Sequence, residues 1–361
     1  MNKSAKATKQ DELASRPARV KAARQGSVKY LNIAKSGKND EFYTILTDIE
    51  KELRHYKEHF TKKTVLCNCD DPKVSNFFVY FSRNFGRLRL KKLITTCYRN
   101  QDPDLFSKHD SKVGAYLMYE GERNGNRVPN VERIGIYPLE GDGDFRSEEC
   151  VNLLKQSDIV VTNPPFSLFR EYVAQLVEYQ KKFLIIGNWN AVTYKNIFKL
   201  IKDDKLWIGV NSNRNFSGFI VPKHYPLRGT EARIDEHGNR VVSTNITCWF
   251  TNLDIKKRHE DLILYKTYNP QEFPRYDNYD AIEVSKTADI PCDYEGVMGV
   301  PVTFLKYYNP DQFEIVGSDY EVKQGLLPEL IERGWTGKID RGYVEGKRLF
   351  ARILVRRRIS R

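Results

Sequence analysis

The sequence predicts an α/β protein with a doubly wound, Rossmann-like sheet and a smaller lobe at its C-terminal end. Short apolar runs alternate with amphipathic segments as far as residue 253, which is typical of strands and helices around a parallel sheet. One of these runs ends in a proline corner that leads at once into a helical pattern. After Asp254 the composition shifts to Tyr, Asn, Asp and Pro, which predicts a lobe of loops and short strands without a long helix before about Pro328.

The composition narrows the class of protein. With 361 residues, 40% of them hydrophobic and 12% aromatic, the chain can bury one large core, or one core and a smaller lobe. No apolar run approaches the length of a membrane span, and the first thirty residues are basic and polar, so we expect a cytoplasmic protein with no membrane partner. The six cysteines form no CxxC pair, which predicts reduced thiols and no metal site.

The expected elements follow one another along the chain. Buried strands are predicted at 64–69, 92–98, 134–139, 158–162 and 182–187, with further strands at 205–210 and 246–253. Helical patterns occupy 74–85 and 148–154. Residues 99–133 form a long polar insertion at the edge of the sheet, and residues 211–245 form a second insertion with a hairpin at 233–241.

The proline corner is the most informative stretch, "DIVVTNPPFSLFREYVAQLVEY". Pro164 and Pro165 lack an N–H, so the strand must end at about Thr162. Apolar residues then recur with helical spacing from Leu168. Ligands bind at the carboxyl ends of strands in such sheets, which places Asn163 and Phe166 at the rim of a site. A tight strand exit is the structural alternative for this corner.

The positive charge lies at the two ends of the chain. Residues 1–38 hold ten Lys or Arg against two acids, and residues 346–361 hold seven against none. Such basic ends commonly follow a phosphate backbone, although a lone basic tail can also serve only solubility. We divide the chain into a flexible basic arm at 1–38, a catalytic domain at 39–253 and a lobe with a basic end at 254–361.

The corner suits chemistry on an aromatic amine. Such a nitrogen is a poor nucleophile because its lone pair is delocalised into the ring. The amide oxygen of Asn163 and the carbonyl oxygen of Pro164 can each accept one N–H and direct the lone pair at an electrophilic methyl group, while Phe166 stacks on the ring. Asn163 is neutral, so the proton leaves only after transfer.

Four motifs in this order resemble those of EcoRI-type adenine-specific DNA methyltransferases, and the likeness covers most of residues 38–315. They are Asp40-Glu41-Phe42-Tyr43-Thr44, Cys69-Asp70-Asp71-Pro72, Gly141-Asp142-Gly143-Asp144-Phe145-Arg146-Ser147 and Asn163-Pro164-Pro165-Phe166. The resemblance implies a Rossmann-like methyltransferase sheet, S-adenosylmethionine as cofactor, and methyl transfer to the exocyclic amino group of adenine in double-stranded DNA. It also implies a restriction-modification enzyme that acts as a monomer, with GAATTC as the leading recognition site.

The resemblance assigns roles to individual residues. Asn163, Pro164, Pro165 and Phe166 fall on the catalytic motif that holds the flipped adenine. The cofactor-binding positions are Asp40, Phe42, Tyr43 and Thr44 over its methionine part, Asp70 and Asp71 at the first strand end, and Asp142 or Asp144 with Phe145 beside its adenine. Two features depart from the family pattern: a glycine-rich first loop is missing, and Cys97-Tyr98 replaces the acid that usually ends the second strand. Asp70 and Asp71 can alternatively be helix caps, and Gly141 to Asp144 only a turn.

Other functions share this kind of corner. The same fold methylates guanine amines in RNA or glutamine side chains in proteins, and a non-catalytic nucleic-acid binder is a third possibility. A lobe of about a hundred residues after the catalytic half favours duplex DNA, because a flipped base needs many flanking contacts. Target recognition is expected from this lobe and from the insertion after Val210, where four arginines can enter a groove: Arg214, Arg228, Arg233 and Arg240.

Overall fold

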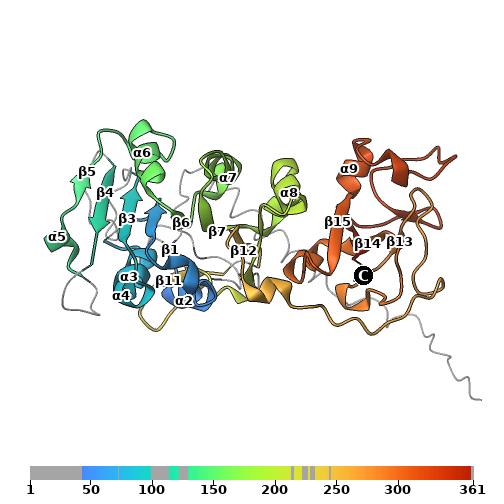
Figure 1. The fold of residues 1–361 in the computed structure, drawn as a ribbon, viewed down its shortest axis with the longest axis horizontal. Coiled ribbons are helices and arrows are strands. Elements are labelled where there is room, and N and C mark those ends of the chain that lie inside the picture. The colour runs from blue at the N-terminus through green and yellow to red at the C-terminus, as the bar shows by residue number, and fades with distance from the viewer. Residues whose placement is uncertain are drawn as a thin grey trace, which may run out of the picture.

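The computed structural model describes residues 43–71, 73–98, 114–121, 129–212, 215–221, 227, 232–243 and 245–358. Its largest feature is an eight-stranded mixed sheet (Figure 1). In spatial order its strands are β5 (Tyr137–Pro138), β4 (Ala115–Tyr119), β3 (Lys92–Cys97), β2 (Thr64–Asn68), β6 (Ile159–Thr162), β7 (Lys182–Asn188), β12 (Thr247–Thr251) and β8 (Trp207–Ser212). The central strands β3, β2, β6 and β7 are parallel, and antiparallel strands extend the sheet on both sides. The predicted α/β class is confirmed.

The strand order reverses between β2 and β6. From β2 the chain passes to β3 on one side, and it later returns through β6 and β7 on the other side. The residues that follow β2 and β6 therefore lie next to each other at the carboxyl edge of the sheet. In doubly wound folds this reversal point is where ligands bind.

Side chains alternate between two buried layers along each central strand. Leu66, Val160 and Ile185 pack into one core cluster, whereas Val65 and Val161 pack into the other. The first cluster is covered by α6 (Glu148–Gln156), α7 (Phe169–Glu178) and α8 (Lys195–Lys202), and the second by α2 (Leu46–Leu53), α3 (Asn76–Arg83) and α4 (Phe85–Leu88), as Figure 1 shows. Each large apolar side chain buried here contributes about 1.5–3 kcal/mol, so both helical layers hold the sheet. None of the helices in the described part of the chain is long and apolar enough to cross a membrane.

Two sequence predictions at the sheet edge were wrong. Residues 99–133 were expected to be a polar insertion, yet β4 at Ala115–Tyr119 pairs with β3 and buries alternate side chains. The strand predicted at 134–139 is reduced to β5, whose residues Tyr137 and Pro138 are exposed. Both differences have one cause, because β4 takes the place beside β3 and leaves β5 at the edge, where proline is tolerated.

A smaller four-stranded sheet joins distant segments. Its order is β1 (Tyr43–Thr44), β9 (Phe219–Val221), β11 (Arg240–Val242) and β10 (Ala232–Ile234). The predicted hairpin is confirmed as β10 and β11, with Gly238 at a φ of +77° in its turn. This sheet connects the hairpin to the beginning of the described chain.

A separate sheet forms in the C-terminal part of the chain (Figure 1). In spatial order its strands are β13 (Ile282–Glu283), β14 (Met298–Pro301), β18 (Arg352–Arg357) and β15 (Phe313–Ser318). The short helix α9 (Asp319–Lys323) follows β15 along the chain, and the turn η5 (Lys256–His259) precedes β13. Its core is continuous with the first core cluster, because Met298, Val300 and Phe304 belong to that cluster. A long helix does not begin at Pro328, where the structure has only the three-residue turn η8 (Pro328–Leu330).

Candidate active site

The loop after β2 begins with a sharp change of backbone direction. Cys69 adopts a φ of +66°, and the Asp70 N–H donates to the carbonyl oxygen of Thr96 at the end of β3 at 2.9 Å. Helix α3 then starts at a capping serine, because the Ser75 hydroxyl oxygen accepts from the N–H groups of Phe77 and Phe78. The ends of β2 and β3 and the start of α3 are thus held together.

Asp70 lies at the meeting point of these segments. Its Oδ2 is 2.6 Å from the Thr162 hydroxyl, and its Oδ1 accepts from the Ser75 hydroxyl at 3.1 Å. The backbone N–H of Asn163 is a further donor to this carboxyl group. Burial raises the pKa of Asp70 to about 7, with a smaller contribution from Asp71, and the three hydrogen bonds oppose that rise.

The proline corner follows β6 as the sequence predicts. β6 ends at the buried Thr162, Asn163 is half-buried, and Pro164 is buried. The carbonyl oxygen of Pro165 accepts from the N–H of Leu168 at 3.0 Å, which closes the short turn η2 (Phe166–Leu168) before α7. The corner is therefore a rigid turn whose first residue stands at the carboxyl end of a central strand.

Strand β9 lies against this corner and is paired with β1. The Phe166 ring meets Phe219 of β9 edge to face, with centroids 6.1 Å apart. Phe219 pairs with Thr44 of β1, and the Thr44 carbonyl oxygen accepts from Asn76 Nδ2 at 2.8 Å. The structure thus brings Tyr43 and Thr44 to the same edge of the sheet as the corner. Asp40 and Phe42 lie outside the described residues.

The loop at 141–147 reaches the end of β3. Gly143 has a φ of +82°, and a Cβ at this position would collide with the carbonyl oxygen of Cys97. The Tyr98 hydroxyl donates to Asp142 Oδ2 at 3.1 Å. An acid therefore stands at the end of β3, although the sequence of that strand does not supply one.

Asp144 and Phe145 are engaged by the protein itself. Arg146 binds both carboxylate oxygens of Asp144, at 2.9 and 2.7 Å, and its hydrogen bonds hold the pKa of Asp144 below the usual value. The Phe145 side chain is 4% exposed and packs edge to face against Tyr172 at 5.0 Å. Of the two acids proposed near the cofactor adenine, Asp142 is the one that stands at the strand end.

Sequence reasoning missed several contacts of this site. Thr162 and Ser75 bind Asp70, Phe219 supports Phe166, and Tyr98 holds Asp142. Thr162 directly precedes the proline corner, so its position next to Asn163 was the available signal. Ser75 lies five residues after Asp70 and was likewise within reach of local reasoning, whereas Phe219 and Tyr98 lie far from the motifs they contact and only the fold brings them together.

The predicted groove arginines are placed only in part. The guanidinium group of Arg233 donates to the Ser243 hydroxyl at 2.6 Å and to the Ser217 carbonyl oxygen at 2.8 Å, so it braces the hairpin. Arg240 lies on β11 of the same hairpin. Arg214 and Arg228 lie outside the described residues.

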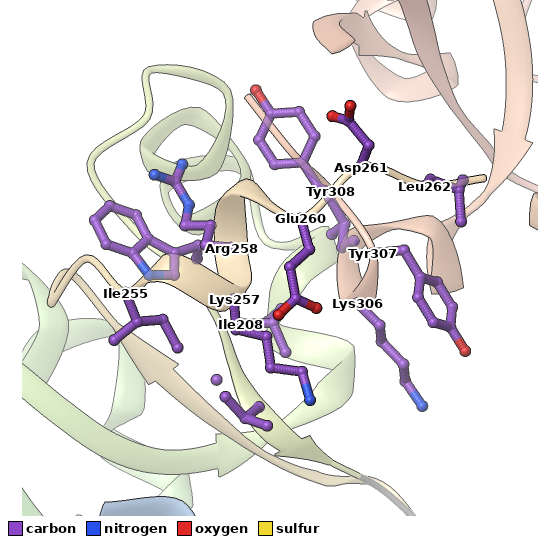
Figure 2. A pocket seen from close by; sticks show the side chains of 14 residues that line it. Ile208, Ile255, Lys257, Arg258, Glu260, Asp261, Leu262, Lys306, Tyr307 and Tyr308 are labelled. Carbon is purple, nitrogen blue, oxygen red and sulfur yellow. The ribbon is translucent and has the colours of Figure 1, made fainter. Parts of the chain in front are cut away.

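Two cavities lie away from the strand ends, where the C-terminal part meets the sheet. One of about 170 Å³ is lined by residues that include Trp207, Arg258 and Tyr308 (Figure 2). The Arg258 guanidinium lies over the Trp207 ring at 3.9 Å from its centroid. The second, of about 740 Å³, has acids and His259 in its wall. Neither contains a residue of the site described above.

Comparisons with known proteins agree on one family. The family model described as adenine-specific methyltransferase EcoRI matches residues 30–358. The chain is 57% identical over 296 residues to the type II methyltransferase M.EcoRI of Escherichia coli, which covers 81% of this chain and 90% of that protein. It is 38% identical to the type II methyltransferases M.MgeORF184P of Mycoplasma genitalium and M.MpnI of Mycoplasma pneumoniae, covering 91% of this chain and 98% of each relative. No solved structure matches the chain.

Proposed function

Because the chain belongs to the EcoRI family of adenine-specific methyltransferases, we propose that it transfers a methyl group from S-adenosylmethionine to the exocyclic amino group of adenine in double-stranded DNA. The modification occurs at a short fixed sequence, and the 57% identity to M.EcoRI supports GAATTC as that sequence. The chain serves as the modification enzyme of a type II restriction-modification system and acts as a monomer.

One observation supports this assignment most directly: Asn163 stands at the carboxyl end of β6, beside β2, at the reversal point of the sheet. There the Asn163 amide oxygen and the Pro164 carbonyl oxygen accept the two N–H groups of the adenine amine. Phe166 holds the extruded base by stacking. These acceptors act on the developing positive charge at nitrogen, which is where preorganised groups lower a barrier most.

The residues at the strand ends fit a cationic cofactor that also carries hydroxyl groups. Asp71 lies at the end of β2 and Asp142 at the end of β3, so carboxylates flank the site where an amine or a ribose would bind. Thr44 contacts Asn76 at the start of α3, the helix that follows Asp71 along the chain, and Asp40, Phe42 and Tyr43 belong to the same segment as Thr44. Asp144 and Phe145 contribute by holding the 141–147 loop in place. When bound, the cofactor supplies an electrophilic methyl group on sulfur.

Residues after Asp254 are proposed as the target-recognition lobe, together with the insertion at 211–245, whereas the basic arm at 1–38 adds affinity for phosphates without choosing the sequence. Extrusion of a base costs a few kcal/mol and must be offset by contacts to flanking bases and phosphates. The catalytic half alone offers too little surface for these contacts.

Long-read sequencing of DNA from cells that express the chain tests the proposal, with cells that express Asn163→Ala as the matched control. Methylated adenine should appear at one short motif with the wild type and be absent with the variant. Loss of the amide oxygen should lower the rate by about a hundredfold or more while cofactor binding persists. Modified cytosine, adenine methylation without a motif, or a signal confined to RNA or protein would each reject the assignment.

A further inference from the structure

One carboxyl group joins the loop after β2 to the proline corner after β6. We propose that Asp70 is a positioning residue for methyl transfer, whose ionised carboxylate fixes Asn163 relative to the end of β2. This inference rests on the proposed function, because it assigns Asp70 a task in that reaction. It also gives Asp70 a different role from cofactor binding.

The contacts of Asp70 come from three separate elements. Thr162 at the end of β6 approaches Oδ2 at 2.6 Å, and Ser75 at the start of α3 approaches Oδ1 at 3.1 Å. The Asn163 N–H adds a bond at the first residue of the corner itself. Both oxygens therefore face the protein, and the group acts on Asn163 through its backbone.

The Thr162 hydroxyl has one proton and two acceptors within reach, the carboxyl group of Asp70 and the carbonyl oxygen of Asn68. When Asp70 is ionised, the Thr162 hydroxyl donates its proton to the carboxylate, and this hydrogen bond joins β6 to Asp70. When Asp70 is protonated, its own O–H can donate to Thr162, and the Thr162 proton turns to Asn68. The two protonation states thus hold the corner by two different hydrogen-bond arrangements.

The pH at which the arrangement changes follows from the surroundings. Burial raises the pKa of Asp70 to about 7. The other groups that face it are Asp71 in the same loop, Cys67 and Cys69 around the end of β2, Cys97 on β3 and Tyr172 on α7. Burial also raises the pKa values of the three thiols and the phenol, so these four groups stay neutral near pH 7. Ionisation of Asp70 should therefore increase as the pH rises through about 7.

The test compares the wild type with Asp70→Asn, Asp70→Ala and Thr162→Val, and uses Asp71→Asn as a matched acid-to-amide control. Single-turnover methylation of duplex DNA is measured from pH 5.5 to 8.5. Cofactor affinity is measured by calorimetry, and amide exchange of peptides that cover residues 159–168 is followed by mass spectrometry. The last two readouts do not depend on turnover.

We expect the wild-type rate to rise with pH through an inflection near 7. An amide cannot ionise, so Asp70→Asn should lose this step and be about tenfold slower at pH 8, and Thr162→Val should also be slower. Asp70→Ala should lose about a hundredfold and speed amide exchange at the corner, because misplacement of a reacting group costs about that much. Asp71→Asn should keep the pH step and weaken cofactor binding.

The results that would contradict the positioning role of Asp70 differ from those that would contradict the proposed function. If Asp70→Asn mainly weakens cofactor binding and keeps the pH step, Asp70 is a cofactor residue and the inference fails. If Asp70→Ala leaves both rate and amide exchange at wild-type values, the group positions nothing. If the wild type itself methylates no duplex DNA, the proposed function fails, and unchanged amide exchange in Asp70→Ala would then separately reject the positioning role.

Discussion

The Phe166 ring and the Phe219 ring meet edge to face, with their planes at 74° and their centroids 6.1 Å apart. Phe166 belongs to the proline corner, whereas Phe219 belongs to the small sheet that also contains Thr44 and the hairpin. The Phe166 ring, which we propose stacks on the extruded base, is therefore oriented by a strand outside the main sheet. Aromatic pairs of this geometry contribute about 0.5–1.5 kcal/mol beyond the area they bury.

Substitution of Phe166 by Ala should weaken capture of the extruded adenine more than it weakens binding of unextruded DNA. Stacking on an aromatic ring contributes about 1–3 kcal/mol per base, and the small side chain removes it. DNA with 2-aminopurine at the target position should give a fluorescence rise with the wild type and a smaller rise with the variant. Tyr194→Ala, which removes an exposed ring outside the site, serves as the control. Equal signals for Phe166→Ala and the wild type would show that Phe166 only packs.

Glu52 should be among the most important residues for stability in the catalytic half. Its side chain is fully buried, and burial raises its pKa. The N–H groups of Val210 and Asn211 donate to it at 2.8 and 2.7 Å, and the Tyr56 hydroxyl donates at 2.9 Å. Glu52→Ala should therefore lower the free energy of unfolding by about 3 kcal/mol, because several buried donors lose their acceptor at once.

Urea denaturation at neutral pH measures this change. The exposed Glu50→Ala on the same helix is the control and should alter stability by less than about 0.5 kcal/mol. If both variants unfold at the same urea concentration, the contacts of Glu52 contribute little to the folded state.

Much of the main sheet could be predicted from the sequence, because its central strands are short apolar runs separated by helical patterns. The runs at 64–69, 92–98, 158–162 and 182–187 appear as β2, β3, β6 and β7. The edge could not be predicted in the same way. β4 buries only alternate residues, so its mixed sequence resembles that of a polar insertion. Its pairing with β3 becomes visible only in the structure.

The site was predictable where its chemistry lies in contiguous motifs and unpredictable where it depends on contacts over long distances in the sequence. The corner at Asn163 was visible from two prolines after a strand. The acid at the end of β3 could not be predicted from the sequence, because Asp142 lies 44 residues after Tyr98, to which it is hydrogen-bonded. For Asp70 the sequence predicts cofactor binding or helix capping, since nothing local places Thr162 beside it. Pairings of this kind follow from strand order, which a single sequence does not specify.

His259 should make stability depend on pH at the junction with the C-terminal part. Its ring nitrogens contact Asp311 on one side and Asp254 on the other, and these acids raise its pKa above the ordinary value of 6.5. A side chain whose pKa is higher in the folded protein than in the unfolded chain stabilises the fold fully when the pH is below the unfolded-state pKa. This stabilisation is lost as the pH rises through the folded-state pKa. His259→Gln should therefore destabilise the protein at pH 6 and have little effect at pH 9.

Thermal unfolding of the wild type and His259→Gln at both pH values measures the difference. The effect should be modest, because the His259 side chain is 35% exposed and solvent screens the pairs. His237→Gln, on the exposed hairpin turn, should change stability equally little at either pH. A His259→Gln effect that is the same at pH 6 and pH 9 would mean that packing, and not charge, is what His259 contributes.

The basic arm should set general affinity for DNA and leave the choice of sequence unchanged. Residues 1–38 carry ten Lys or Arg, and each one that neutralises a phosphate steepens the dependence of log affinity on log salt by about 0.9. Deletion of residues 1–36 should therefore flatten that dependence and weaken cognate and non-cognate duplexes by similar factors, because phosphate contacts carry no base information. Binding is measured by fluorescence anisotropy over a salt series, with GAATTC and a scrambled duplex in parallel. A slope that the deletion leaves unchanged would assign the arm to solubility, and a loss confined to the cognate duplex would assign it to base recognition.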